Sequence, residues 1–490
     1  MRHPSVQSRC AKWACGLLTL ALGACAVGPD FKAPAAPVAK TYGSEALPGT
    51  TEVAGGQAQR FSTDTRLPTD WWRLFGSPEL DALVEQALAH NPGVQAAEAS
   101  LRQSQDNLRA GQGVFFPQLG LNAQAVHERT TTANQGLSLP GSVFNVYALS
   151  GNVSYVLDLF GHDRRVVEGL QAQADLQGHL RRAAYLSLSA NVVNTAIAYA
   201  AYDVQTRQTE LLLALQETQA KEIEAQYRAG TAAYASVLQQ QALLAATRAA
   251  LAPLRQRRSA ALHLLAALSG QDPDQWQAPR LDLAQFKTVA DLPLSLPSEL
   301  VRQRPDILAA EAQLHIASAN VGVATSDLYP QISLNGSYGA ASNSWGNLSA
   351  AKGRFWSVGP SLSLPLFQGG SAWYTRKAAE EAFMASQASY RQTVLAAFEQ
   401  VADALKALEH DAQAMQAQGD ALRLSEDALH LAQVNERAGL IAGTDALAAQ
   451  IQVIQARINE LQARAQRHQD TVALFAALGG GWWNGPERQP

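Results

Sequence analysis

Histidines and cysteines are the side chains of this sequence best suited to catalysis or metal binding. The 490 residues include ten histidines and three cysteines. The histidines are scattered without a zinc-ligand spacing such as H-E-x-x-H, and His263 lies in a leucine-rich stretch where a packed or capped histidine is the simpler interpretation. Neither a G-x-S-x-G nucleophile turn nor a G-x-x-x-x-G-K phosphate loop occurs. The sequence therefore predicts a protein that is not an enzyme, with no catalytic residue and no metal site.

Cys25 is the residue with the clearest predicted chemistry. A basic stretch containing Arg2, Arg9 and Lys12 is followed by the short apolar stretch Trp13–Ala21. This order is typical of a secretory signal peptide, and the apolar part is too short to span a bilayer as a helix. The cysteine follows directly after this signal.

The residues before Cys25, Leu22-Gly23-Ala24, are similar to the lipobox of bacterial lipoproteins, in which the cysteine thiol is lipidated and becomes the new N-terminus. The alternative is an ordinary signal peptide that ends near a cysteine. An Asp directly after such a cysteine favours inner-membrane retention, so Ala26 is consistent with the outer membrane. Cleavage before Cys25 leaves no second cysteine for a disulfide, and the N-terminal lipid is the sole predicted non-protein group.

The charge balance of the chain argues against nucleic-acid binding. The sequence has 38 basic and 42 acidic side chains, and removing the three basic residues of the signal leaves 35 against 42. A nucleic-acid partner needs a basic face. After the signal, the sequence contains no run of 18 apolar residues, so no transmembrane helix is predicted.

One sequence pattern occurs twice. Segment 116–122, FPQLGLN, is echoed by segment 329–335, YPQISLN, and the RAG at 228–230 is echoed by the RAG at 437–439. A duplicated unit predicts internal pseudo-symmetry, with each copy in the order helix, two strands, long helix, turn, helix. The predicted boundaries are a signal peptide 1–24, a lipidated extended segment 25–76, a first repeat 77–290, a second repeat 291–483 and a tail 484–490.

The sequence of each repeat predicts a long antiparallel helical hairpin. Helices of about 164–228 and 378–437 would each reach ~90–100 Å, and each ends at Arg-Ala-Gly, where Gly230 and Gly439 can close a helix in the left-handed conformation. Shorter helices return over 238–268 and 447–478. The second long helix has a heptad seam of Val394, Phe398, Val401, Leu405, Leu408, Ala412 and Met415. A second seam of Leu424, Ala428 and Leu431 runs beside it, which suits a wall of neighbouring helices.

The segments between the helices alternate between apolar and polar residues, as transmembrane β-strands do. They are 119–126, 147–159, 332–338 and 356–366. A soluble, half-buried sheet also alternates, so the pattern alone leaves both interpretations open. Four strands cannot close a membrane barrel, because the smallest have eight and an open edge is excluded from lipid. Two chains would give eight strands, and three would give twelve and a lumen.

The mature chain resembles a TolC-like outer-membrane factor of the lipoprotein (NodT-type) branch that serves tripartite RND efflux systems. The residues that carry the resemblance are Val27–Phe31 (VGPDF), Trp71–Phe75 (WWRLF), Pro78–Leu80 (PEL), Pro117, Pro330, Leu157–Gly161 (LDLFG) and Ala477–Trp482 (ALGGGW).

The resemblance implies a mainly α, α+β fold, in which a long helical barrel of three copies is continuous with a shared outer-membrane β-barrel of four strands per chain. It also implies a homotrimer in outer-membrane lipid, extending into the periplasm, with a periplasmic adapter protein and an inner-membrane RND-type transporter as partners. Such a duct exports drugs, toxic compounds or metals, and the sequence does not specify which.

The resemblance places a periplasmic aperture at the second hairpin tip. Asp445 matches the acidic residue that narrows the aperture in the family, with Thr444 and Leu440 beside it. The alternative for Asp445 is a carboxylate that binds free N–H groups at a helix start. Many relatives carry a second acid one turn later, where this chain has Ala448, so a hydrophobic or polar closure stays open.

The two tips, with Arg228, Gly230, Arg437 and Gly439, are predicted to contact the adapter. Arg437 could instead interact only with the C-terminus of its own helix. The sequence also leaves two other functions open: a polypeptide secretion duct of the same family, and a lipid-anchored coiled-coil scaffold without a pore.

Overall fold

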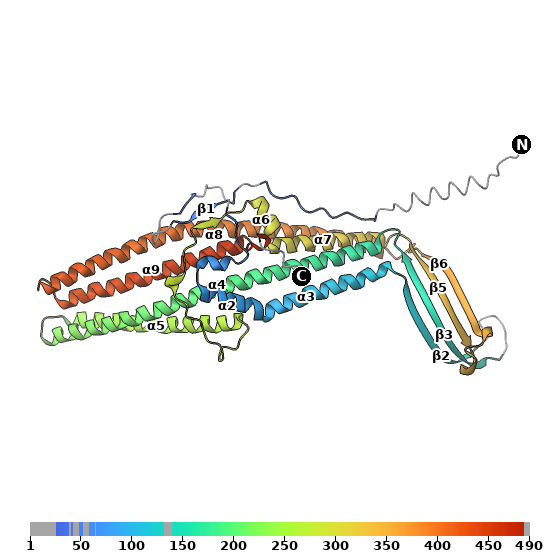
Figure 1. Ribbon diagram of the computed structural model, residues 1–490, viewed down its shortest axis with the longest axis horizontal. Helices are drawn as coiled ribbons and strands as arrows, with labels where there is room; N and C mark the ends of the chain where they lie inside the picture. The colour runs from blue at the N-terminus through green and yellow to red at the C-terminus, as the bar shows by residue number, and fades with distance from the viewer. Residues whose placement is uncertain are drawn as a thin grey trace. The chain divides into compact units, whose positions relative to one another are not determined.

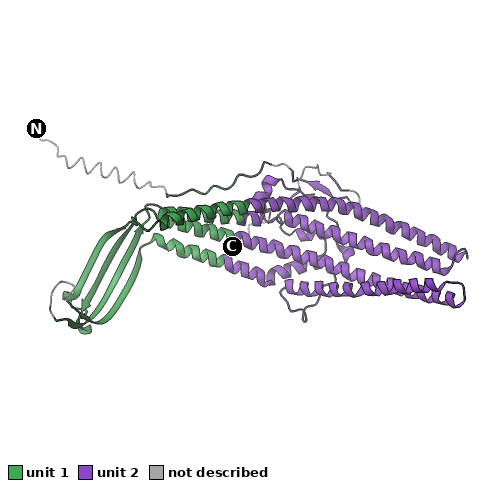
Figure 2. Cartoon of the chain, turned by 180° about the vertical axis from the view of Figure 1, so that it is seen from behind, with its two compact units in different colours: residues 1–34, 101–177, 310–390 green, residues 35–100, 178–309, 391–490 purple. Residues whose placement is uncertain are grey.

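The computed structural model describes residues 26–38, 41–42, 49–51, 58–63, 65–131 and 140–484. The predicted signal peptide and Cys25 lie outside these residues. The chain divides into two compact units, one of residues 1–34, 101–177 and 310–390, and one of residues 35–100, 178–309 and 391–490 (Figure 2).

The order of elements repeats within the chain (Figure 1). The first repeat is α2 (Pro78–His90), α3 (Pro92–Gly111), β2 (Gln118–Thr130), β3 (Ser142–Leu157), α4 (His162–Arg228) and α5 (Tyr234–Leu268). The second is α6 (Pro297–Gln303), α7 (Pro305–Ser326), β5 (Gln331–Ser342), β6 (Arg354–Ser363), α8 (Ser371–Arg437) and α9 (Gly443–Ala477). Both long helices have 67 residues and both returning helices have 35, so the predicted duplication is confirmed.

Each repeat has two helices before its strands, where one was predicted. The breaks fall at Pro92 and Pro305, and the preceding residues Asn91 and Arg304 both have extended backbone with ψ of 124°. The proline ring disfavours the helical conformation of the residue before it, which separates α2 from α3 and α6 from α7.

The first unit contains a four-stranded antiparallel sheet in the order β2-β3-β5-β6. The two repeats join at its centre, where β3 pairs with β5 from Tyr147 opposite Ser342 to Leu157 opposite Ile332. The strands β2 and β6 form its edges, and neither edge is paired with another strand of the described residues. All four predicted strands are therefore confirmed, although β2, β3 and β5 are longer than predicted and β3 and β6 begin and end earlier than predicted.

The register gives the sheet one apolar face and one polar face. Leu119, Val153 and Val358 align across the strands, as do Leu121, Tyr338 and Trp356 in the next row on the same face. This face is open to the surroundings in a single chain, and Leu119 and Trp356 are 80% and 74% exposed.

The opposite face of the sheet carries small polar side chains. The Ser154 hydroxyl donates to Asn335 Oδ1 at 3.0 Å, and the Ser337 and Ser357 hydroxyls lie 2.8 Å apart. An apolar exposed face opposite a polar one is the pattern of a strand between lipid and an aqueous lumen.

The second unit is helical around a buried core. Trp71 packs edge-on against Phe475 with ring centroids 5.6 Å apart, and Phe75 and Leu80 are also fully buried. β1 (Arg60–Ser62) pairs in parallel with β4 (Asp291–Pro293). Among the described residues, no helix is both long and apolar enough to cross a membrane.

The two seams predicted on α8 differ in their surroundings. The seam from Val394 to Met415 is buried except for half-buried Phe398. Leu424, Ala428 and Leu431 of the second seam are all exposed. The second face of α8 therefore has no covering element within the described part of the chain.

Candidate anchor site and hairpin tips

Both hairpin tips end their long helix in the same way. At the second tip the Gly439 N–H donates to the Glu436 carbonyl at 2.9 Å and the Leu440 N–H donates to the Asn435 carbonyl at 2.8 Å. This bond pair is the Schellman motif, which needs a left-handed residue, and Gly439 supplies it with φ of 71°.

The first tip has the same closure with different side chains. Gly230 has φ of 77° and its N–H donates to the Tyr227 carbonyl at 2.9 Å, while the Thr231 N–H donates to the Gln226 carbonyl at the same distance. Thr231 and Leu440 occupy the same position after the glycine, so the first tip exposes a hydroxyl where the second exposes a leucine.

Asp445 lies in the first turn of α9. Its Oδ2 accepts a hydrogen bond from the Ala442 N–H at 3.3 Å, and its own N–H donates to the Ala442 carbonyl at 3.0 Å. The carboxylate therefore binds a free N–H at the helix start, which is the second of the two predicted roles. Asp445 is exposed and lies near Leu440 and Thr444 in the sequence. A role in an aperture needs several copies of the chain around one axis, so this role stays a prediction.

The arginines of the tips make contacts within their own helices. Arg437 Nε donates to the Gln433 carbonyl at 3.1 Å, and Arg228 pairs with Glu224. Both side chains lie near helix C-termini, where a positive charge is favourable. Their predicted contact with an adapter remains a prediction.

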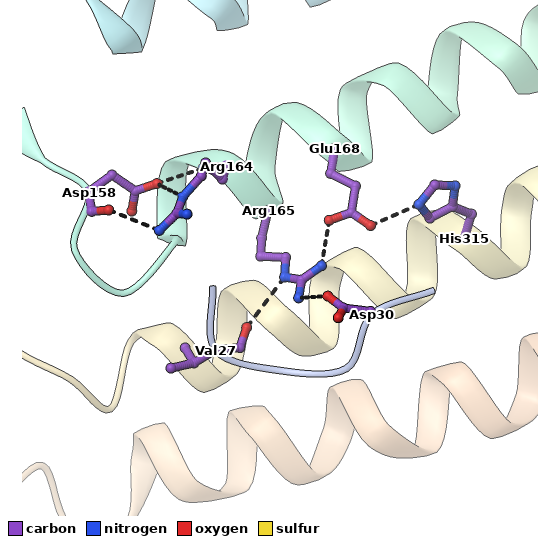
Figure 3. Close-up of polar contacts among 7 residues, drawn as sticks. All are labelled: Val27, Asp30, Asp158, Arg164, Arg165, Glu168 and His315. Atoms are coloured by element: carbon purple, nitrogen blue, oxygen red, sulfur yellow. Dashed lines mark hydrogen bonds and ion pairs between the residues drawn. The ribbon is translucent and has the colours of Figure 1, made fainter. Parts of the chain in front are cut away.

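The sequence motif after Cys25 docks on the first unit through Arg165 (Figure 3). Arg165 Nη2 donates to Asp30 Oδ1 at 2.8 Å, and Nε donates to the Val27 carbonyl at 3.3 Å. The Val27 N–H donates in turn to the Phe160 carbonyl at 3.0 Å. The segment 26–31, which we name the N-terminal strap, is thus fixed at the start of α4.

Acidic groups compensate the buried charge of Arg165. Nη1 donates to Glu168 Oε2 at 2.7 Å, and the other oxygen of Glu168 lies 2.8 Å from His315 Nε2. Burial alone would lower the pKa of Arg165, but the hydrogen bonds with Asp30 and Glu168 raise it, so the guanidinium stays charged.

Two further contacts fit the N-terminal strap to helix α7. Phe31 stacks on the His315 ring with centroids 4.2 Å apart and an interplanar angle of 11°. Gly28 has φ of 94°, and a Cβ there would lie 2.6 Å from the Cα of Gly322. Any larger residue at Gly28 would push the strap away from α7.

The strap connects two of the sequence motifs, because the Val27 N–H donates to the Phe160 carbonyl. Val27–Phe31 and Leu157–Gly161 are distant in sequence, and Arg165 was not among the predicted site residues. Arg165 lies four residues after Gly161, and this closeness to the Leu157–Gly161 motif was the one sign in the sequence that it could be a site residue. The sequence alone does not reveal that its partner is Asp30.

The family model "Outer membrane efflux protein" matches residues 83–271 and 296–480, one match for each repeat. The chain belongs to the outer membrane efflux protein family. It is 31% identical to the outer membrane protein OprJ of Pseudomonas aeruginosa over 96% of this chain and 95% of OprJ. It is 29% identical to the pyoverdine export outer membrane protein OpmQ of Pseudomonas putida over 89% of this chain and 93% of OpmQ.

A solved structure of a relative has the same fold. The outer-membrane channel OprN superimposes with a TM-score of 0.81 at 30% identity, covering 94% of this chain and all of that chain. The predicted mainly helical fold, outer-membrane location and efflux function are confirmed by membership in this outer membrane efflux protein family. These relatives are named as an outer membrane protein, a pyoverdine export outer membrane protein and an outer-membrane channel.

Proposed function

We propose that three copies of this chain form the outer-membrane duct of a tripartite efflux pump. In this assembly an inner-membrane RND-type transporter delivers cargo through a periplasmic adapter to the hairpin tips. The duct itself does not change the cargo chemically.

The two-faced sheet carries this proposal. Its apolar face is exposed, its opposite face is polar, and both edge strands lack a neighbour among the residues that the structure describes. Unpaired edges cannot remain in lipid, so other copies must supply the missing neighbours. Three copies give twelve strands, and a barrel of that size leaves a lumen, whereas the interior of an eight-stranded barrel is filled by side chains or holds one small ligand.

Small organic molecules are the proposed cargo. The relative OpmQ is named for pyoverdine export. A duct lined by serine and asparagine side chains discriminates little between small polar and amphipathic solutes, so we assign selection of the cargo to the transporter.

A lipid on Cys25 is the proposed anchor. The N-terminal strap supports this role, because Arg165 fixes Val27 and Asp30, which follow Cys25 closely in the sequence, at the start of α4.

An acidic aperture is the proposed constriction. Three copies of Asp445 around one axis, with Leu440 and Thr444 beside them, would favour cations and repel one another. The polypeptide duct and the pore-free scaffold are the alternatives. Neither is favoured by a contact in the described part of the chain.

Single-channel recording in planar bilayers tests the duct. The purified full-length lipoprotein should give discrete conductance steps, and its mass in detergent should be that of three chains. A protein that gives no conductance, even after Asp445→Ala substitution, would support the scaffold. A smaller assembly with no lumen would contradict the trimer.

A further inference from the structure

Charged side chains are rare in the four-stranded sheet. Its strands contain Glu128 and Arg129 on β2 and Arg354 on β6, and no other Asp, Glu, Lys or Arg. The register places Arg129 and Arg354 on the apolar face, together with His127, and Glu128 on the polar face. The described strands therefore carry two arginines and no carboxylate on the face that we assign to lipid.

Both arginines lie toward one end of the sheet. β3 leads into α4 and β6 leads into α8 at the opposite end, so the turns of both strand hairpins share the end away from these helices (Figure 1). The helical barrel of this family extends into the periplasm, so the end with the turns faces the exterior of the cell. We name it the outer end, and its turns are residues 131–141 and 343–353.

The outer end is positively charged, although the chain as a whole has a net charge of −4. Its two turns contain no Asp or Glu in their sequence, and the second adds Lys352. Arg129, Lys352 and Arg354 therefore stand against Glu128 alone, and three copies of the chain multiply this excess of positive charge.

The duplication gives the depth of Arg354 in the membrane. Leu366-Phe367 repeats Leu159-Phe160 at an offset of 207 positions (366 − 159), so Arg354 is the equivalent of Tyr147. Ten residues separate Tyr147 from Leu157 (157 − 147), and both lie on the apolar face. Ten residues extend ~34 Å along a strand, and a tilt of about 40° reduces this to a height of ~26 Å, which matches the ~25 Å apolar band of a membrane barrel. Tyr147 and Arg354 therefore lie where the band ends.

Aromatic side chains mark the same depth. Tyr147 packs edge-on against Trp345 with ring centroids 5.7 Å apart. Trp356, the neighbour of Arg354 on the apolar face, is 74% exposed. Aromatic residues gather in girdles where the apolar band of a membrane barrel meets water. The aromatic residues and the strand length thus agree that Arg354 lies at the outer edge of the band.

We propose that Arg354 and Arg129 bind the phosphate groups of the phosphorylated glycolipid in the outer leaflet. This inference rests on the proposed duct. Arg129 lies four residues beyond Ala125, the partner of Tyr147 on β2, and so ~14 Å further outward along the strand. Both guanidinium groups are therefore at the depth of the lipid headgroups.

A phosphorylated lipid fits both parts of this surface. A guanidinium presents its N–H groups in a planar fork that matches a phosphate, and the apolar face offers it no carboxylate from the strands. The acyl chains of the same lipid would cover the apolar rows below, which include Leu121 and Tyr338. Closing the barrel sets β6 of one copy beside β2 of the next, so the two arginines come from neighbouring strands.

Native mass spectrometry tests the site. The full-length protein is reconstituted in phosphatidylcholine nanodiscs that contain diphosphorylated lipid A, and the lipid A molecules that stay bound to the released trimer are counted. We expect the wild type to retain lipid A, and Arg354→Gln and Arg129→Gln each to weaken its retention roughly fivefold. The matched control Arg423→Gln removes an exposed arginine of α8 instead, and should leave retention unchanged.

The number of phosphates separates headgroup binding from acyl-chain binding. Monophosphorylated lipid A should be retained less than the diphosphorylated form by the wild type, and the variant with both arginines replaced by Gln should not distinguish the two lipids. Replacing both arginines with Lys keeps the charge but loses the planar fork, so that variant should give intermediate retention. Equal retention of both lipids by the wild type would show that the apolar face alone holds them, and would overturn the inference.

Trimer mass and conductance separate two kinds of failure. A double Gln variant that forms conducting trimers and retains as much lipid A as the wild type overturns this inference and leaves the proposed function intact. A wild-type protein that forms no trimer and gives no conductance overturns the proposed function. Both arginines are exposed, so the variants should fold.

Discussion

Arg165 Nη2 lies 2.8 Å from Asp30 Oδ1, so a side chain of the first long helix holds a residue five positions after the predicted lipidated Cys25. The Arg165 side chain is 5% exposed and that of Asp30 is 88% exposed. The arginine therefore belongs to the interior of the first unit, and the aspartate reaches it from the surface.

Replacing Arg165 with Ala should release the N-terminal strap. The variant loses hydrogen bonds to Val27, Asp30 and Glu168, and the cost should be about 2 kcal/mol, because charged hydrogen bonds contribute more than neutral ones and Asp30 is solvent-screened. Limited proteolysis should cut the strap faster in the variant. The control Arg164→Ala, which removes a contact with Asp158 instead, should leave cleavage of the strap unchanged.

Replacing Cys25 with Ser should abolish acylation, since a hydroxyl is not the nucleophile that lipid transfer uses. Several acyl chains are needed for firm anchoring, so the variant should depend on its barrel to remain in the membrane. Mass spectrometry of the N-terminal peptide is the measurement. An unmodified Cys25 in the wild-type protein would refute the predicted anchor.

Two substitutions at Asp445 separate its charge from its hydrogen bond. Asp445→Asn keeps an acceptor for the Ala442 N–H but removes the charge, so it should lower cation preference with little loss of stability. Asp445→Ala should lower both the cation preference and the stability, with a stability cost of about 1 kcal/mol.

Reversal potentials in a salt gradient, measured beside thermal unfolding, distinguish the two roles of Asp445. The cation preference of the wild type should weaken at high salt, because the field is screened. Unchanged selectivity in both variants, with a lower melting temperature for Asp445→Ala alone, would assign Asp445 to the helix start.

The tip glycines should tolerate alanine poorly for backbone reasons alone. A Cβ at Gly439 meets nothing within 4 Å, but φ of 71° costs a residue with a Cβ about 1–2 kcal/mol. Gly419→Ala, inside α8 and also with open space around it, should instead stabilise the helix by up to about 1 kcal/mol. Thermal unfolding checks this prediction: the melting temperature should fall in Gly439→Ala and rise in Gly419→Ala.

Stability should fall as the pH rises because of Asp411. Burial, a hydrogen bond with Asp470 and the charge of Asp470 raise the pKa of Asp411 well above the usual value of about 4. The folded protein therefore holds a proton that the unfolded chain has already released, and this contribution to stability is lost between the usual pKa and the raised one.

Asp411→Asn should remove this dependence on pH. The variant should gain melting temperature relative to the wild type as the pH rises, because an amide needs no proton to stay neutral. Parallel pH curves for the two proteins would exclude Asp411 as the source.

Local patterns in the sequence were enough to predict the repeated elements. Alternation along 356–366 identified a strand, and the Arg-Ala-Gly at 437–439 identified a helix end, since both depend on residues that are near neighbours in the chain. The buried seam from Val394 to Met415 followed from heptad spacing in the same way.

The tertiary structure decided the contacts that join distant residues. Periodicity does not predict the pairing of β3 with β5, the ion pair of Arg165 with Asp30, 135 positions apart, or the closeness of Asp411 to Asp470. Periodicity states which face of an element is apolar, but not which other element covers it. That choice depends on how the whole chain packs.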